Sequence, residues 1–254
     1  MKPSQIIFFV AVFFAQPAVL HAGDISIKAQ LVELHFPICD TKLSDVLSAF
    51  DIPEDSYKNR KIFFFDEKDF ALMQNGTILK AYLTHKGKAK SVVKLRPIEY
   101  DRIDAKWEEY DGFSCEDDWY LEDLQSSCSI KEEIAASRLA AVANGQMTAK
   151  ELFSEDQSVF AEEYSSRKIP WDEMISFGPI AAKIWEKNDL DIELWYKPNV
   201  WETIEISLRV LKPDAEAKRT RMLQYFKDNG LKTCTARQGK TAQLFKHLQS
   251  SPAR

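Results

Sequence analysis

Three strand-like runs, closely spaced between residues 60 and 96, constrain the fold of this chain more than any other stretch. Lys61–Phe65 is rich in aromatic residues, Ile78–Thr84 follows an Asn75-Gly76 pair, and Ser91–Arg96 follows a turn rich in lysine and glycine. An Asn-Gly pair is typical of tight hairpins, because both turn positions need a positive φ. We therefore expect neighbouring antiparallel strands in this region.

Cationic side chains recur on one face of the last two runs. Successive side chains of a strand point to opposite sides, so Lys80 shares a face with Tyr82, and Lys94 shares a face with Arg96. The formal net charge of the chain is −5, which excludes the chain-wide basic field of a nucleic-acid-binding protein. Any anion site must therefore be a local cluster, and we predict no nucleic-acid partner.

The first 22 residues have the features of a secretory signal peptide. Lys2 supplies the positive charge, Ile6–Phe14 forms the apolar core, and Leu20-His21-Ala22 offers a cleavage point before Gly23. This apolar core is shorter than the roughly 20 residues of a spanning helix; an uncleaved anchor is the alternative. We predict an exported protein, periplasmic or secreted, without a stable membrane span after cleavage. Residues 23–254 would form a single domain, and its oligomeric state stays open.

The four cysteines are expected to form disulfides in an exported chain. Four cysteines allow three sets of pairings. Cys115 and Cys128 are close in sequence and bracket an acidic, aromatic segment, so their pairing would pin a surface loop. Cys39 would then pair with Cys234 and tie the end of the first strand to the C-terminal region.

Hydrophobic periodicity and capping signals predict the remaining elements. Helices are expected at 41–50, 213–228 and 238–250, and in a helical insertion around 129–165. The insertion would hold a helix over 129–143, with Ser129 and Glu132 as a capping box, and a second helix from Thr148 toward Tyr164. Further strands are expected at 25–36, 181–186, 191–196 and 201–210.

The order of these segments resembles the CYTH family, the triphosphate tunnel metalloenzymes. The resemblance runs over most of residues 25–210. The residues that match the family pattern are Glu33 in the first strand, Phe65-Asp66-Glu67, Gly76 with Leu79-Lys80-Ala81-Tyr82, Lys94-Leu95-Arg96, Gly178-Pro179 with Lys183, and Glu205-Ile206-Ser207. Lysine and tyrosine stand where the family has two arginines in the second motif. Leu31 and Ser207 stand where it has further acids.

The resemblance implies an α+β fold, an antiparallel β-barrel that forms a tunnel, with helices packed outside and polar faces turned inward. It places phosphate-binding cations at Lys80, Lys94, Arg96, Lys183 and Arg209. It places carboxylates for Mg²⁺ or Mn²⁺ at Glu33, Glu193 and Glu205. The other inward residues would be His35, Tyr82 and Ser207. Phosphates would satisfy several of these cations at once.

Three functions are consistent with this pattern. The first is a metal-dependent hydrolase of a triphosphate, and the second is a receptor that binds a small phosphorylated or polyphosphate ligand without turnover. The third is a structural or interaction protein, with the acidic segment between Cys115 and Cys128 as its contact surface. Under the last two functions the catalysis of the family is lost. In the third, the inward cations pair only with the acids of the tunnel.

Overall fold

The computed structural model describes residues 30–198, 201–234 and 239–250. The predicted signal peptide and the first residues of the predicted 25–36 strand lie outside the described residues. The strands are β1 (Leu31–Ile38), β2 (Lys58–Asp66), β3 (Thr77–Thr84), β4 (Ala89–Leu95), β5 (Phe113–Tyr120), β6 (Asp123–Ile134), β7 (Ile175–Lys187), β8 (Leu190–Lys197) and β9 (Trp201–Leu211). The α-helices are α1 (Leu43–Ala49), α2 (Ala71–Gln74), α3 (Ala136–Ala143), α4 (Glu155–Tyr164), α5 (Ala215–Asp228) and α6 (Lys240–Ser250).

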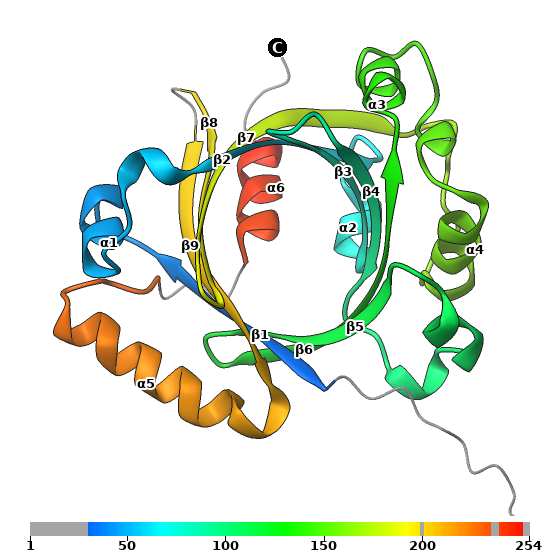
Figure 1. Ribbon diagram of the computed structural model, residues 1–254. Helices are drawn as coiled ribbons and strands as arrows, with labels where there is room; N and C mark the ends of the chain where they lie inside the picture. The colour runs from blue at the N-terminus through cyan, green and yellow to red at the C-terminus, as the bar shows by residue number, and fades with distance from the viewer. Residues whose placement is uncertain (1–29, 199–200, 235–238, 251–254) are drawn as a thin grey trace, which may run out of the picture.

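The strands close into a barrel in the order β1-β5-β6-β4-β3-β2-β7-β8-β9 (Figure 1). Every neighbouring pair is antiparallel except β1 and β5, which run parallel. The predicted α+β barrel with helices outside is therefore confirmed, with one parallel pair added. Among the helices of the described ranges, none combines the length and the apolar character needed to cross a lipid bilayer.

The barrel is apolar outside and largely polar inside, the reverse of a small barrel whose interior is filled by apolar side chains. The outward residues Leu79 and Val93 belong to one core with Leu139 of α3 and Phe160 of α4. A second core joins the outer faces of β1, β8 and β9 to α1 and α5. Because the helices cover these apolar faces, the alternate residues of the same strands are left pointing into the barrel.

Helix α6 lies against the inner side of the ring of strands (Figure 1). Its buried residues Leu244 and Phe245 pack with Ile62, Phe64 and Ile78, which project inward from β2 and β3. This third core is apolar and rich in aromatic residues, so it seals one part of the barrel interior. The polar cavity begins where α6 begins, at Lys240.

Two predictions of local structure are wrong. The segment from Ser129 to Ile134 is not helical but continues β6, because it pairs with both β4 and β5; the helix begins only at Ala136. The helical insertion therefore starts later than predicted. Asn75-Gly76 does not form a two-residue hairpin turn either: Asn75 has a φ of −99° and caps α2, while Gly76 alone has a positive φ of 82°.

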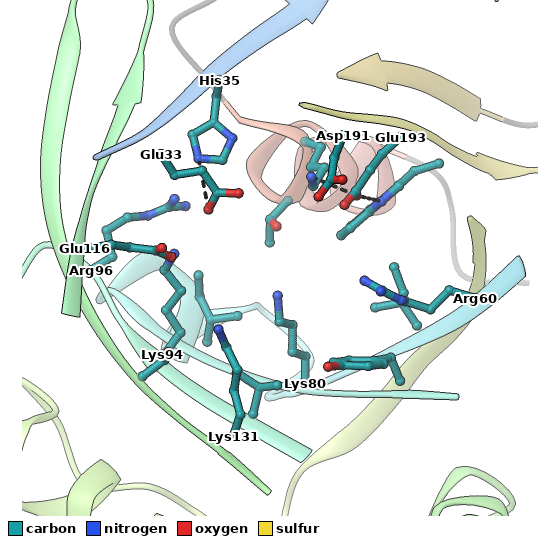
Figure 2. Close-up of a pocket in the computed structure, with 18 of the residues that line it drawn as sticks. Glu33, His35, Arg60, Lys80, Lys94, Arg96, Glu116, Lys131, Asp191 and Glu193 are labelled. Carbon is teal, nitrogen blue, oxygen red and sulfur yellow. Dashed lines mark hydrogen bonds and ion pairs between the residues drawn. The ribbon is translucent and has the colours of Figure 1, made fainter. Parts of the chain in front are cut away.

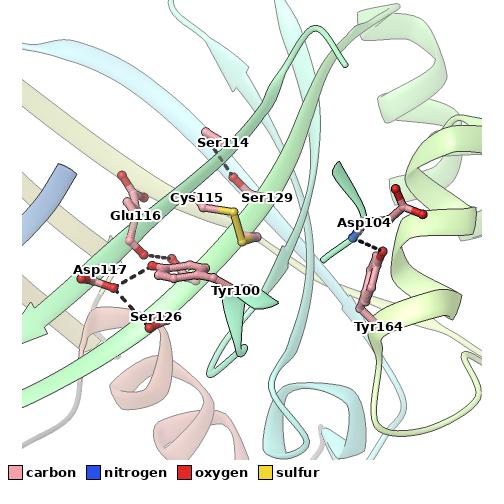
Figure 3. The surroundings of a disulfide bond; sticks show 11 residues. Tyr100, Asp104, Ser114, Cys115, Glu116, Asp117, Ser126, Ser129 and Tyr164 are labelled. Carbon is pink, nitrogen blue, oxygen red and sulfur yellow. Dashed lines mark hydrogen bonds between the residues drawn. A yellow bond between two sulfur atoms is a disulfide. The ribbon is translucent and has the colours of Figure 1, made fainter. Parts of the chain in front are cut away.

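Both disulfides join the predicted partners, Cys39 with Cys234 and Cys115 with Cys128. The second does not pin a surface loop, because its cysteines lie opposite each other in the β5–β6 ladder. Figure 3 shows its surroundings, where Tyr100 donates a 2.6 Å hydrogen bond to Asp117 on the outside of the barrel. The acidic segment between these cysteines is thus part of the barrel wall and not a surface loop, and only Glu122 and Leu124 within it are exposed.

Candidate functional site

A cavity of about 270 Å³ lies inside the barrel, with cations on one wall and acids on the other (Figure 2). Arg60 of β2, Lys80 of β3 and Lys131 of β6 line the basic wall. Across the described ranges, no carboxylate lies within the 4.0 Å of an ion pair from any of these three cations. The guanidinium of Arg60 instead lies 4.6 Å from the ring centre of Tyr82.

Lys80 is the most strongly perturbed of these cations. Burial, followed by the neighbouring cations Lys94, Lys131 and Lys240, lowers its pKa from 10.5 to about 7. Burial also lowers the pKa of Lys131. Placing like charges together in a partly desolvated site is costly unless an anion joins them. The basic wall therefore has the electrostatic character of an anion-binding site.

Lys94 and Arg96 of β4 are held by acids of β5. Lys94 Nζ lies 2.9 Å from Asp118 Oδ2 and 3.4 Å from Glu116 Oε1, and Arg96 Nη1 lies 3.2 Å from Asp118 Oδ2. Asp118 is fully buried. Burial alone would raise its pKa, but Lys94, His35 and Arg96 together hold the pKa well below its usual value. These two predicted cations therefore face the cavity already paired.

His35 of β1 links two acids across the interior. Its Nδ1 lies 3.1 Å from Glu205 Oε1, and its Nε2 lies 3.4 Å from Asp118 Oδ1. Burial opposes a charged imidazole, but Glu33, Glu205 and Asp118 outweigh burial and raise its pKa to about 9. Its ring also stacks on Tyr120, with ring centres 4.1 Å apart. The histidine is thus a buried cation at neutral pH.

Arg209 of β9 joins the acids at the other end of the cavity. Its Nε lies 2.9 Å from Glu116 Oε2, and its Nη2 lies 3.1 Å from Glu33 Oε2. Burial disfavours the charged guanidinium, but the two carboxylates hold its pKa above its usual value. About half of the side chain is exposed. A ligand could therefore reach this cation from solvent.

Glu193 of β8 and Glu205 of β9 share one cation. Lys240 Nζ, at the start of α6, lies 2.8 Å from Glu193 Oε2 and 2.8 Å from Glu205 Oε1. Burial lowers the pKa of a lysine, but these two carboxylates hold the pKa of Lys240 well above its usual value. Burial would conversely raise the pKa of both glutamates, and Lys240 lowers it in each case.

A divalent cation does not fit the predicted trio of Glu33, Glu193 and Glu205 in this arrangement. Carboxylate oxygens bind Mg²⁺ or Ca²⁺ at about 2.0–2.6 Å, whereas the Lys240 ammonium already contacts two of the three acids. A different group, Glu33, His35 and Asp118, has ligand atoms within 4.8 Å of one another. Its histidine is protonated at neutral pH and so lacks a free lone pair. The protein's own cations balance this acidic wall.

The structure brings together most of the residues that the sequence placed in the tunnel. Six of them line the cavity: Lys80, Lys94, Arg96, Arg209, Glu33 and Glu193. Glu205 is not a lining residue but contacts one, Lys240. The prediction that Lys183 binds phosphate inside the tunnel is wrong. Arg60 points inward and pairs with Ala182 in the β2–β7 register, so the next residue, Lys183, points outward. Its ammonium lies 4.3 Å from the ring centre of Tyr57.

Sequence reasoning missed six charged residues in or beside the cavity, among them Asp191, which shares a face of β8 with Glu193. Alternation along β2 and β6 could have indicated Arg60 and Lys131, had the second of these segments been recognised as a strand. The sequence pattern predicts a loop at Glu116 and Asp118, although they alternate with Cys115 and Asp117 in a strand-like pattern. Lys240 comes from a terminal helix, and no local signal indicates that this helix enters the barrel.

No protein-family model and no curated protein matches the sequence. Among solved structures, a Hippeastrum protein described as having a dominant triphosphatase activity is similar at 14% identity and a TM-score of 0.60, over 87% of this chain and 97% of that one. A Bacillus halodurans protein provisionally named an adenylate cyclase is similar at 11% identity and a TM-score of 0.59, over 85% and 98%. This likeness shows that the chain has the CYTH-like tunnel fold.

Proposed function

We propose that this protein binds a triphosphate or polyphosphate-type anion inside its tunnel. The observation that carries the proposal is the basic wall, where Arg60, Lys80 and Lys131 face the cavity without a paired carboxylate among the described residues. A chain of phosphates would meet several of these cations at once through charge-assisted hydrogen bonds. Lys94, Arg96 and Arg209 also line the cavity and would extend the site, at the cost of loosening their present ion pairs.

The size of the cavity favours a compact ligand. Its volume of about 270 Å³ lies below the roughly 300–1,000 Å³ of sites that enclose drug-sized molecules. A short inorganic phosphate chain suits such a space better than a nucleotide with its base and ribose. We also propose that the protein is exported. This location favours an inorganic phosphate chain over a nucleotide, because nucleoside triphosphates are mainly cytosolic. N-terminal sequencing of the exported protein would test this part, and a mature chain starting at Gly23 is expected.

Thermal unfolding in the presence of tripolyphosphate tests the binding proposal. We expect tripolyphosphate to raise the Tm in buffer that contains EDTA, because a ligand that binds only the folded state stabilises it. The rise should be lost in Lys80→Met with Lys131→Met, and kept in Lys183→Met, which removes a cation from the outer face of the same barrel. An unchanged Tm across a polyphosphate series, or an equal loss in all variants, would contradict the proposal.

A second candidate is a metal-dependent phosphohydrolase. The grouping of Glu33, His35 and Asp118 favours it, because their ligand atoms lie within 4.8 Å of one another, and Glu33 and His35 face the basic wall across the cavity (Figure 2). A bound Mg²⁺ or Mn²⁺ would polarise a phosphate, but it would first have to displace the proton of His35. Phosphate release from tripolyphosphate that requires Mn²⁺ or Mg²⁺ and stops with EDTA would support this candidate. Binding without release under either metal would leave a tunnel that binds the anion but does not hydrolyse it.

A further inference from the structure

Helix α6 inserts a lysine between two carboxylates on the acidic wall. The remaining contacts of these acids are also made by the protein: Trp195 Nε1 donates a 2.6 Å hydrogen bond to Glu193 Oε2, and His35 Nδ1 lies 3.1 Å from Glu205 Oε1. Glu205 is almost fully buried, at 1% exposure. The pair is therefore a closed arrangement in which each carboxylate has protein partners and the ammonium carries the compensating charge.

The position of Lys240 is fixed by its neighbours on both sides. Gly239 is buried against the ring of Tyr120, where a Cβ would come within 2.4 Å of a ring atom. On the other side, Phe245 packs edge-on against Phe64 and Phe70, with ring centres 5.2 and 4.8 Å apart. The ammonium is therefore held at the two glutamates as long as α6 stays docked in the barrel.

A divalent ion and this ammonium compete for the same place. Both are cations that neutralise the same two carboxylates, and an ion that bridges Glu193 Oε2 and Glu205 Oε1 at about 2.0–2.6 Å would take the place of the ammonium that lies 2.8 Å from each of these oxygens. Repulsion between the two charges adds to this competition in this poorly solvated interior. Binding of an ion to Glu193 and Glu205 would thus require Lys240 to leave.

We propose that Lys240 is the resident cation of the Glu193–Glu205 pair, so that docking of α6 and binding of a divalent metal at this pair exclude each other. The chain itself then supplies the positive charge that an ion would bring to this part of the tunnel. The proposal concerns the acidic wall and does not depend on whether the basic wall binds phosphate.

Titration with Mn²⁺ alone, without any phosphate compound, tests the proposal. Electron paramagnetic resonance of free Mn²⁺ gives the affinity of the full-length protein. We expect Lys240→Met to bind Mn²⁺ at least tenfold more tightly than the unchanged protein, and Glu193→Gln added to Lys240→Met to abolish this gain. Lys246→Met, which removes an exposed lysine of the same helix, should bind Mn²⁺ like the unchanged protein.

Two results would overturn the proposal. One is a folded Lys240→Met variant, verified by circular dichroism, that gains no Mn²⁺ affinity, since the ammonium would then not be what excludes the ion. The other is an unchanged protein that binds Mn²⁺ tightly and loses this affinity in Glu193→Gln alone. The comparison of the unchanged protein with Glu193→Gln does not need the Lys240 variant, so it tests the proposal even if Lys240→Met fails to fold. If Mn²⁺ bound instead at Glu33, His35 and Asp118, its affinity would fall in Glu33→Gln and stay unchanged in Glu193→Gln.

Discussion

Glu193 and Glu205 lie directly opposite each other on β8 and β9, and the ammonium of Lys240 is 2.8 Å from an oxygen of each. Two like charges at facing positions of a ladder repel each other. Here the repulsion is offset by a cation from a helix more than thirty residues further along the chain. The barrel wall and α6 thus depend on each other electrostatically.

Removal of this cation should destabilise the protein strongly. Lys240→Ala leaves the buried carboxylate of Glu205 and the partly buried carboxylate of Glu193 without their shared partner, and loss of one member of a buried ion pair typically costs about 3–5 kcal/mol. Urea unfolding measures the change. Lys246→Ala, on the exposed side of α6, should change the free energy of unfolding by no more than about 0.5 kcal/mol. Equal effects of the two substitutions would mean that the buried pair contributes nothing to stability.

Lys80 should make stability depend on pH. Its pKa is about 7 in the folded protein and 10.5 in its ordinary state, so between these pH values the unfolded chain binds more protons at this position. Stability therefore gains a contribution that rises with pH from about 7 to about 10. Lys80→Met lacks this contribution. In urea unfolding at pH 7, 8 and 9, we expect the stability of Lys80→Met relative to the unchanged protein to fall as the pH rises. A constant difference would contradict the lowered pKa.

Alternation along single strands predicted much of the cavity correctly. Lys80, Lys94 and Arg209 could be placed on inner faces because each lies on a strand whose other face is plainly apolar, so one assignment fixes all side chains of that strand. The inward placement predicted for Lys183 is wrong because it rests on a motif and not on the alternation of side chains along β7. There, the apolar residues Ile180 and Ala182 point inward toward α6, so the polar-inside rule is reversed.

The remaining errors come from contacts that join distant parts of the chain. Asp118 reaches the cavity because β5 runs parallel to β1, and no local pattern in either strand indicates that pairing. The helical spacing of Ile130 and Ile134 predicts a helix at Lys131, but the pairing of β6 with β4 and β5 outweighs that local preference. Lys240 enters the site only through the docking of α6. Each case is decided by tertiary structure, which short-range periodicity does not encode.

Gly76 should tolerate no side chain. Its φ is +82°, and a Cβ would lie 2.4 Å from the backbone oxygen of Arg96, at the end of the cation-bearing strand β4. Gly76→Ala therefore combines a strained backbone, about 1–2 kcal/mol, with a clash that backbone atoms cannot relieve by rotating. Gly87→Ala is the matched control, because its φ is +75° but no atom lies within 4 Å. We expect urea unfolding to show a clearly larger loss for Gly76→Ala; equal losses would show that the close approach to Arg96 is relieved at no cost.

The disulfide between Cys39 and Cys234 should hold α6 in the barrel. The segment around Cys234 runs beside the end of β1, where Cys39 N donates to Lys232 O and Cys234 N donates to Pro37 O, both at 2.8 Å. Only five residues separate Cys234 from Lys240, so this anchor limits how far α6 can move. Replacing both cysteines by serine should lower stability by roughly 2–5 kcal/mol.

Hydrogen exchange distinguishes this anchoring role from a general effect of losing a disulfide. We expect the amides of α6 to exchange faster in the Cys39→Ser, Cys234→Ser protein under native conditions, because a released segment opens locally without global unfolding. The matched variant is Cys115→Ser with Cys128→Ser, which removes a bond inside the β5–β6 ladder. This variant should be less stable than the unchanged protein. The ratio of the amide exchange rates of α6 to those of the barrel strands should be the same in both. If α6 responded equally to both, the Cys39–Cys234 bond would act on the whole fold and not on the helix that carries Lys240.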